Sequence, residues 1–366
     1  MSEVPGRDPP TCSRAAPRKD AMNVVTVEEH WVTPAIARAL DQQPAETRDD
    51  SLALNARGDI ATRLLDIGDG RIAAMDAAGI DMQILSIAPP GTGGLPAAEA
   101  VVLSREANDA AAAAVRAHPT RFRALATLPT PDPDATVVEL ERCATVLGHV
   151  GVMTYGRSRD RWLDDPAYED LLATASRLQQ PVFIHPQIPA KAVRDAAYSG
   201  FDPMTDLALA TFGWGWHVEA GTAALRLILR GTFDRHPDLQ IVLGHWGEML
   251  LASLDRIDSL SNVTTHLERR VADYICDNVH IATSGMLTPR LLRHALEVTT
   301  IDRIVLSGDY PFHRIDTNAI EAFLSTLPDS SDQEKVAHHN AATLFNLVAP
   351  ASASAGNNGN RKEVQR

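Results

Sequence analysis

The chain has 366 residues, a formal net charge of -13 and three cysteines that lie far apart in the sequence. Its basic residues form no run, which excludes the cationic surface of a nucleic-acid-binding protein. No apolar run reaches the roughly 20 residues that span a bilayer, so a membrane partner is excluded as well. The scattered cysteines make no disulfide framework, which favours a reducing cytoplasm.

Both ends of the chain have too few apolar residues to bury a core. Residues 1–22 alternate proline, arginine, aspartate and alanine without the apolar stretch of a secretory signal, and residues 349–366 are rich in alanine, serine, glycine and asparagine. We therefore expect a disordered leader over 1–22, one folded domain over 23–348 and a disordered tail over 349–366. Met22 directly precedes the first apolar run, which leaves open whether the leader belongs to the natural protein.

Between these ends, short apolar runs alternate with helical patterns. The first run covers 24–30 and is followed by a polar, irregular segment over 34–58, which we expect to be a loop, and by a helical pattern over 59–78. The later runs cover 82–87, 122–128, 150–155, 181–185, 240–243, 279–282 and 303–306. The helices expected after them cover 96–117, 134–147, 166–178, 219–229, 249–261, 264–275, 288–298, 316–326 and 331–346. Eight such units predict a parallel sheet closed into a (β/α)₈ TIM-type barrel with additional helices.

Polar residues end four of the predicted strands. They are Glu28 and His30, His185, His245, and Asp309. In a barrel the carboxyl ends of all strands lie on one rim, where the active site forms. Glu28 and His30 are two residues apart and face the same way, whereas Glu29 faces the other. Carboxylate oxygens and imidazole nitrogens suit a divalent ion, so convergence on one rim favours a metal site over an isolated salt-bridged strand end.

The other histidines serve as a comparison group. Most of them precede strands, or lie on helices or in distal loops, and are typical of structural or solvated histidines: His118, His149, His236, His266, His280, His294, His338 and His339. His217 and His313 stay ambiguous. The segment 188–217 holds much of the aromatic content, including Trp214, and either lines a substrate pocket or packs in the ordinary way.

Taken in order, five motifs resemble those of the amidohydrolase superfamily. They are Val-Glu-Glu-His at 27–30, Ile-His-Pro at 184–186, Leu-Gly-His-Trp-Gly-Glu at 243–248, Thr-Ser-Gly at 283–285 and Ser-Gly-Asp-Tyr-Pro-Phe at 307–312. They are most similar to the branch related to aminocarboxymuconate semialdehyde decarboxylase. Within it, the Glu-x-His motif points to decarboxylases of γ-resorcylate, 2,3-dihydroxybenzoate and 5-carboxyvanillate. The resemblance covers about residues 24–347.

This resemblance implies a site. One divalent ion, Zn²⁺ or Mn²⁺, would be held by Glu28, His30, His185 and Asp309. A dyad of His245 and Glu248 would stand beside it as catalytic residues, together with Asp309. Binuclear members of the superfamily carry a carbamylated lysine after the fourth strand, and no lysine stands there in this chain, so a single ion is expected.

Substrate contacts are implied for Arg256 and for Trp214. Arg256 matches an arginine that this branch often places near the substrate, although flanking Asp255 and Asp258 also offer it surface salt bridges. Many relatives have an arginine after the His-Pro of strand five, where this chain has Gln187. The aromatic segment is likewise this chain's own version of a pocket-lining region. Both departures concern the choice of substrate more than the chemistry.

The implied activity is a reversible, metal-dependent, non-oxidative decarboxylation of a small ortho-hydroxybenzoate-like acid, in a homodimer or homotetramer. Asp309 would carry the proton to carbon, with His245 as the alternative donor. A hydrolase that attacks an ester, lactone or amide with a metal-activated water is the main competitor. A metal-binding barrel without catalysis, acting as a partner protein, is a third hypothesis.

Overall fold

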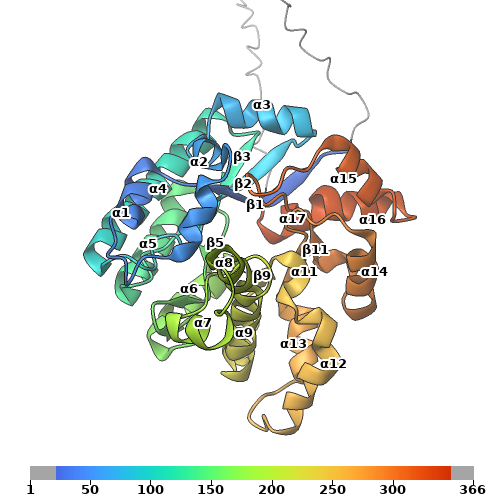
Figure 1. Ribbon diagram of the computed structural model, residues 1–366. Coiled ribbons are helices and arrows are strands. Elements are labelled where there is room, and N and C mark those ends of the chain that lie inside the picture. Colours follow the sequence, from blue (N-terminus) through green and yellow to red (C-terminus); the bar gives the residue numbers. More distant parts are fainter. Residues whose placement is uncertain (1–21, 348–366) are drawn as a thin grey trace, which may run out of the picture.

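The protein is described by a computed structural model over residues 22–347, and Figure 1 shows strands enclosed by helices. Within these residues the strands of the barrel are β1 (Val25–Trp31), β2 (Met82–Ile87), β3 (Phe122–Ala124) continued by β4 (Ala126–Thr127), β5 (Val152–Thr154), β8 (Val182–Ile184), β9 (Ile241–Leu243), β10 (Val279–Ala282) and β11 (Ile304–Val305). A short antiparallel hairpin, β6 (Arg157–Ser158) and β7 (Arg161–Trp162), lies outside it. Apart from residue 22, the predicted leader falls outside the described residues, as does the predicted tail.

Neighbouring strands of the barrel pair in parallel. One sheet has the order β1-β2-β3 and the other the order β11-β10-β9-β8-β5-β4. They meet at Leu125, whose N–H donates to Leu85 while the next N–H, of Ala126, donates to Gly151. At the opposite edge Val27 pairs in parallel with Ser307. The predicted TIM-type α/β barrel is therefore confirmed, and its first and last strands meet at this second seam.

Helices cover the strands on the outside. In chain order they are α1 (Pro34–Asp41), α2 (Ile60–Leu64), α3 (Asp69–Ala78), α4 (Ala97–Ala117), α5 (Pro133–Arg142), α6 (Glu169–Arg177), α7 (Lys191–Ala197), α8 (Pro203–Ala210), α9 (Gly215–Leu229), α10 (Thr232–Arg235), α11 (His245–Glu248), α12 (Leu254–Ile257), α13 (Val271–Asn278), α14 (Pro289–Val298), α15 (Thr317–Leu324), α16 (Ser330–Glu334) and α17 (Asn340–Leu344). Because both faces of a parallel sheet are covered, its strands are short unbroken apolar runs such as Val182–Ile184. None of the described helices is long and apolar enough to cross a membrane.

The prediction of a loop over 34–58 is wrong. The segment folds into α1 and a 3₁₀ helix over Asp50–Ala56. The oxygen of Thr33 caps the first turn of α1, and Pro34 stands at a position where its missing N–H costs nothing. Ile36 and Leu40 share one face of α1 and are buried against the barrel, so tertiary packing outweighs the polar composition of the segment.

Two predicted helices are broken in the structure. The pattern over 59–78 divides into α2 and α3, which begin and end on either side of Leu65–Gly68. The pattern over 249–261 divides into 3₁₀ turns around the single turn of α12. The break falls at Ser253, whose backbone has a non-helical φ of -126° and ψ of 16°.

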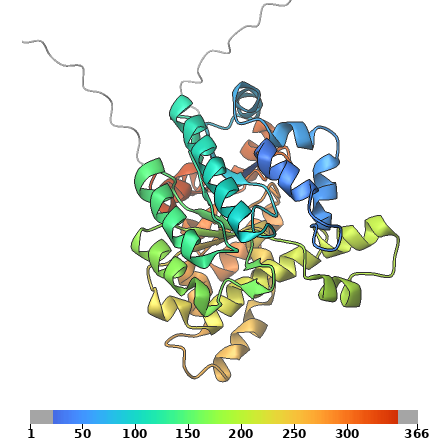
Figure 2. The same cartoon turned by 90° about the vertical axis from the view of Figure 1, so that its left-hand side faces the viewer.

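One segment projects from the barrel. The α7–α8 arm, which we define as residues 191–214, extends outward from the start of α9 (Figure 2). Its exposed apolar side chains are Val193, Phe201, Met204, Phe212 and Trp214. Exposed apolar side chains that gather on one segment often mark an interaction surface.

Candidate metal centre and active site

The site begins with an irregularity in β1. The register of β1 against β2 shifts between Thr26 and Glu29, and Glu28 between them has a φ of 65°. Positive φ is costly for a residue with a side chain, and such strain is concentrated at functional positions. The side chains of Glu28, Glu29 and His30 are all fully buried, which is unusual for three consecutive polar residues at the end of a strand.

The structure brings the four predicted metal ligands together. Glu28, His30, His185 and Asp309 each offer one ligand atom, and these atoms all lie within 4.8 Å of one another. His30 Nε2 lies 3.3 Å from Asp309 Oδ1, and His185 Nε2 lies 3.5 Å from Glu28 Oε1. The four residues come from β1 and from the loops that follow β8 and β11, so the barrel rim places them as expected.

The histidine tautomers suit a cation. Nδ1 of His185 lies 2.7 Å from the carbonyl oxygen of Pro186, and Nδ1 of His30 lies 3.3 Å from that of Ile87. A carbonyl only accepts, so both Nδ1 atoms carry the proton and both Nε2 lone pairs face the cluster. Second partners of this kind commonly orient metal-bound histidines.

Unpaired polar atoms also point to a cation. Glu28 Oε1 and His30 Nε2 are buried and have no hydrogen-bond partner among the described residues. Burial raises the pKa of Glu28 to about 8 and lowers the pKa of His185 well below its usual value. A divalent cation would supply the missing partner for both atoms and would compensate the buried carboxylate. The donor set of two carboxylates and two imidazoles, all buried, therefore fits a divalent metal ion.

Two serines from the predicted motifs hold the other oxygen of Glu28. The hydroxyls of Ser284 and Ser307 both donate to Glu28 Oε2, the latter at 2.7 Å. The backbone N–H of His245 donates to the oxygen of Ser284 at 2.8 Å. These bonds orient Oε1 toward the cluster and connect the ligand to the next strand end.

Glu29 faces away from the cluster and joins the strands behind it. Its two oxygens accept from the backbone N–H of Gly308 and from the side chain of Gln83, both at 2.8 Å. Arg71, fully buried, donates to the carbonyl oxygen of His30 and lies 4.7 Å from the ring centre of Tyr310. Sequence reasoning missed Arg71; its only signal was an arginine within an otherwise apolar helical face.

A second cluster stands beside the first. His245 Nδ1 lies 2.8 Å from Glu248 Oε1, and His217 Nδ1 lies 2.7 Å from Glu248 Oε2. Burial works against a charge on His245, but Glu248, with Glu28 and Asp309 beyond it, outweighs that effect and raises its pKa to about 10. Burial likewise disfavours the charge of Glu248, yet His245 and His217 lower its pKa overall. The expected dyad is thus accompanied by His217, which the sequence left ambiguous.

The remaining candidates lie outside these clusters. Arg256 is exposed on α12, and Asp258, one of its expected partners, pairs with Arg270 instead. Trp214 is exposed on the α7–α8 arm, whereas the neighbouring Trp216 contacts His185 with 6.4 Å between ring centres. His313 lies 3.8 Å from Asp309 Oδ2 but is half exposed.

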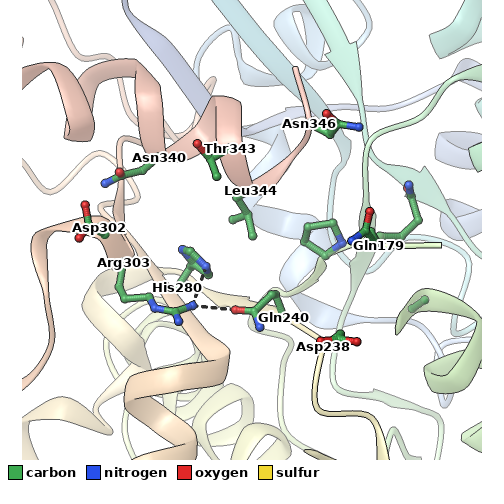
Figure 3. A pocket seen from close by; sticks show the side chains of 13 residues that line it. Gln179, Asp238, Gln240, His280, Asp302, Arg303, Asn340, Thr343, Leu344 and Asn346 are labelled. Carbon is green, nitrogen blue, oxygen red and sulfur yellow. Dashed lines mark hydrogen bonds between the residues drawn. The ribbon is translucent and has the colours of Figure 1, made fainter. Parts of the chain in front are cut away.

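A cavity of about 690 Å³ lies at the opposite, amino-terminal end of the strands (Figure 3). Gln240, His280 and Arg303 are among its lining residues, and Nη1 of Arg303 donates to Gln240 Oε1 at 2.7 Å and to His280 Nε2 at 3.0 Å. None of the metal-ligand candidates lines this cavity. Chemistry in a TIM barrel occurs at the carboxyl ends of the strands, so we place the active site at the metal cluster and not here.

Comparisons with known proteins agree with this placement. A family profile described as amidohydrolase matches residues 7–347. The γ-resorcylate decarboxylase of Rhodococcus jostii is 35% identical over 342 residues, which covers 88% of this chain and 98% of that protein. The 5-carboxyvanillate decarboxylase of Sphingomonas paucimobilis has a crystal structure with a TM-score of 0.81 and 31% identity, covering 90% of this chain and 100% of that one. The structure of a dihydroxybenzoic acid decarboxylase from a Polaromonas species, with bound manganese and 2-nitroresorcinol, has a TM-score of 0.77 and 32% identity, covering 89% and 98%.

Proposed function

The chain belongs to the amidohydrolase family, and from that premise we propose that it is a metal-dependent carboxy-lyase that removes CO₂ from a small hydroxylated aromatic acid. The observation that carries this proposal is the buried cluster of Glu28, His30, His185 and Asp309, with His245 and Glu248 beside it. Relatives that match over most of this chain are decarboxylases of γ-resorcylate and 5-carboxyvanillate, which favours this chemistry over hydrolysis.

The reaction replaces a carboxylate on an aromatic ring by a proton. The ring carbon that bears the carboxylate gains a proton, the bond from that carbon to the carboxylate breaks, and its electron pair returns to the ring as CO₂ leaves. The barrier is the temporary loss of aromaticity. A bound divalent ion would supply positive charge for the carboxylate and the ortho-oxygen of the substrate.

Two side chains are available to handle the proton. We propose that Asp309 delivers it to the ring carbon and is reprotonated from solvent, because its carboxyl belongs to the cluster at which the substrate would bind. His245 would hydrogen-bond the ortho-oxygen through Nε2, while Glu248 holds its Nδ1. The raised pKa of His245 keeps its imidazole protonated in the metal-free chain, so His245 is also able to donate a proton. The alternative in which His245 and not Asp309 protonates the ring carbon therefore needs its own test.

The identity of the ion is part of the proposal. We propose Mn²⁺ or Zn²⁺, because the cluster combines carboxylates with imidazoles and contains no thiolate. A bound manganese in the Polaromonas neighbour supports the first. Metal analysis of protein purified without added metal, followed by reloading of the stripped protein with each ion, decides between them.

Assembly and location are further proposals. The exposed aromatics of the α7–α8 arm support a homodimer or homotetramer, which light scattering on wild-type protein and on a Phe201→Asp variant would test. Contacts of Arg256 and Trp214 with substrate stay predictions; both side chains are exposed in the single chain. The free thiols of Cys143 and Cys276 support a reducing cytoplasm, which cell fractionation would test.

The deciding experiment is a product assay. Metal-loaded protein is incubated with a panel of ortho-hydroxybenzoates, and CO₂ and the proton-substituted phenol are measured, with carboxylation of phenols at high bicarbonate as the reverse reaction. Asp309→Asn and His245→Asn should lower turnover by about 10²–10⁴-fold, and a solvent deuterium isotope effect should identify the donor. Asp277→Asn, an exposed carboxylate near the end of α13 that pairs with Arg269, is the control. Release of an acid that contains oxygen from water would instead support the hydrolase.

A further inference from the structure

His217 contacts a residue of the expected catalytic dyad, and none of the steps above uses it. It is the third residue of α9, and its Nδ1 lies 2.7 Å from Oε2 of Glu248. The other oxygen of Glu248 lies 2.8 Å from Nδ1 of His245. Each carboxylate oxygen therefore faces one imidazole nitrogen. Glu248 is only 1% exposed, so water is not a ready substitute for either partner.

The partners on the far side of the His217 ring fix the proton on Nδ1. The indole N–H of Trp216 can only donate, and it lies 3.1 Å from His217 Nε2. With this bond the neutral ring must carry its proton on Nδ1. The carbonyl oxygen of Phe212 lies 3.1 Å from the same Nε2 and can only accept.

The remaining arrangement, a neutral ring that donates to Phe212, is excluded by Glu248. It would place the lone pair of Nδ1 against a carboxylate oxygen at 2.7 Å, and the pKa of Glu248 is lowered, so this oxygen is not protonated. A ring that donates to Phe212 must therefore be doubly protonated. In either permitted state His217 donates from Nδ1 to Glu248.

We propose that His217 is a positioning residue for the reaction: by occupying Oε2 of Glu248 it fixes the carboxylate plane, so that Oε1 holds Nδ1–H of His245 and Nε2 of His245 faces the substrate. With both oxygens engaged, Glu248 cannot turn away from His245. The two separations are hydrogen-bond lengths, and each imidazole takes a different oxygen, so the cluster needs no second metal ion.

This inference links the dyad to the α7–α8 arm. His217 and Trp216 lie at the start of α9, directly after the arm, and Phe212 belongs to the arm itself. The orientation of His245 therefore depends on where α9 begins as well as on its own turn. Neither the five motifs of the sequence nor the metal cluster includes this contact.

Two substitutions and a matched control test the rate effect. His217→Ala removes the donor to Glu248, and turnover should fall by about 10–100-fold, as for other partners that orient catalytic ligands, with little change in KM. His217→Asn keeps an N–H donor at the place of Nδ1 and should recover most of the turnover. His236→Ala breaks a histidine–carboxylate contact of 2.9 Å to Glu169 outside the site and should leave turnover unchanged.

A spectroscopic readout tests the positioning directly, without metal or substrate. In metal-free protein labelled with ¹⁵N-histidine, the two Nδ1 protons bound to Glu248 should give two imidazole resonances far downfield of the amides. His217→Asn should lose one resonance and leave the other in place. His217→Ala should lose one and broaden or shift the other, because the carboxylate is no longer fixed.

The rate measurement rests on the proposed function, whereas the resonance measurement does not. If wild-type protein releases no CO₂ from any hydroxybenzoate, the proposed function fails and the resonances alone judge His217. The positioning role is overturned if the His245 resonance is unaffected in His217→Ala, or if an active wild-type enzyme and His217→Ala turn over equally fast. It is also overturned if His217→Asn is as impaired as His217→Ala while both stay folded.

Discussion

His280, at the base of the barrel, should make folding stability fall in mild acid. It is the second residue of β10 and is 8% exposed, and its Nδ1 has no hydrogen-bond partner among the described residues. Burial, assisted by the nearby charge of Arg303, lowers its pKa from 6.5 to about 3. Above pH 6.5 the residue is neutral in both the folded and the unfolded chain. Below it, only the unfolded chain binds a proton, so the free energy of unfolding decreases as pH falls.

The size of this effect follows from the two pKa values. At about pH 5 the unfolded histidine is almost fully charged and the folded one is still neutral, so the linkage contribution is RT ln(1 + 10^1.5), about 2 kcal/mol. The folded pKa of about 3 lies well below this pH, so protonation of the folded chain contributes almost nothing to the difference. A loss of this size is a large fraction of the stability of a typical domain.

The measurement compares urea unfolding at about pH 8 and pH 5. Metal-free wild-type protein should lose about 2 kcal/mol more than His280→Gln between these two conditions. Glutamine offers an oxygen to Arg303 and does not titrate, so all other pH-dependent contributions cancel in the difference. His266→Gln, an exposed histidine, should behave like wild type. Equal losses in wild type and His280→Gln would refute the reasoning, because the buried ring would then not be held neutral.

Three further predictions concern the metal cluster. In Gly308→Ala the new Cβ would lie 2.6 Å from Glu29 Oε1, so the backbone before Asp309 must move. Metal content and turnover should both drop sharply. Gly94→Ala, with open space around its Cβ, is the control and should leave both unchanged. Ser284→Ala removes a donor to Glu28, and metal affinity measured by competitive chelation should fall about 10–100-fold. Chelation of the metal should lower the melting temperature, and metal supplied at about 100 times its Kd should restore about 2.7 kcal/mol in equilibrium unfolding; unchanged melting on chelation would contradict a folded-state metal site.

The barrel and most of its rim could be predicted from the sequence because both depend on local patterns. A buried parallel strand is an unbroken apolar run, so its last residue marks the rim, and Glu28, His30, His185 and Asp309 each stand at such a position. Their convergence then follows from the topology of the fold. No long-range detail was needed for this step.

The contacts that were missed depend on tertiary structure. The partnership of His217 with Glu248 joins residues 31 positions apart across two helices, and no spacing rule relates them. Arg71 satisfies backbone carbonyls of β1, a role that depends on where α3 docks. Helix α1 was missed because three buried side chains stabilise it within a segment of polar composition.

The metal cluster lies at the seam between β1 and β11, so metal binding should also affect the closure of the barrel. The barrel closes there through the pairing of Val27 with Ser307, and Glu28 and Asp309 lie directly beyond that pairing, one on each side. An ion shared by these two carboxylates would link the first strand of the barrel to the last, so metal binding would also stabilise the closure of the barrel. Unfolding of the loaded protein should consequently require both terminal strands to detach together, whereas the stripped protein joins them by backbone pairing and by hydrogen bonds such as those from Ser307 to Glu28 and from Gly308 to Glu29.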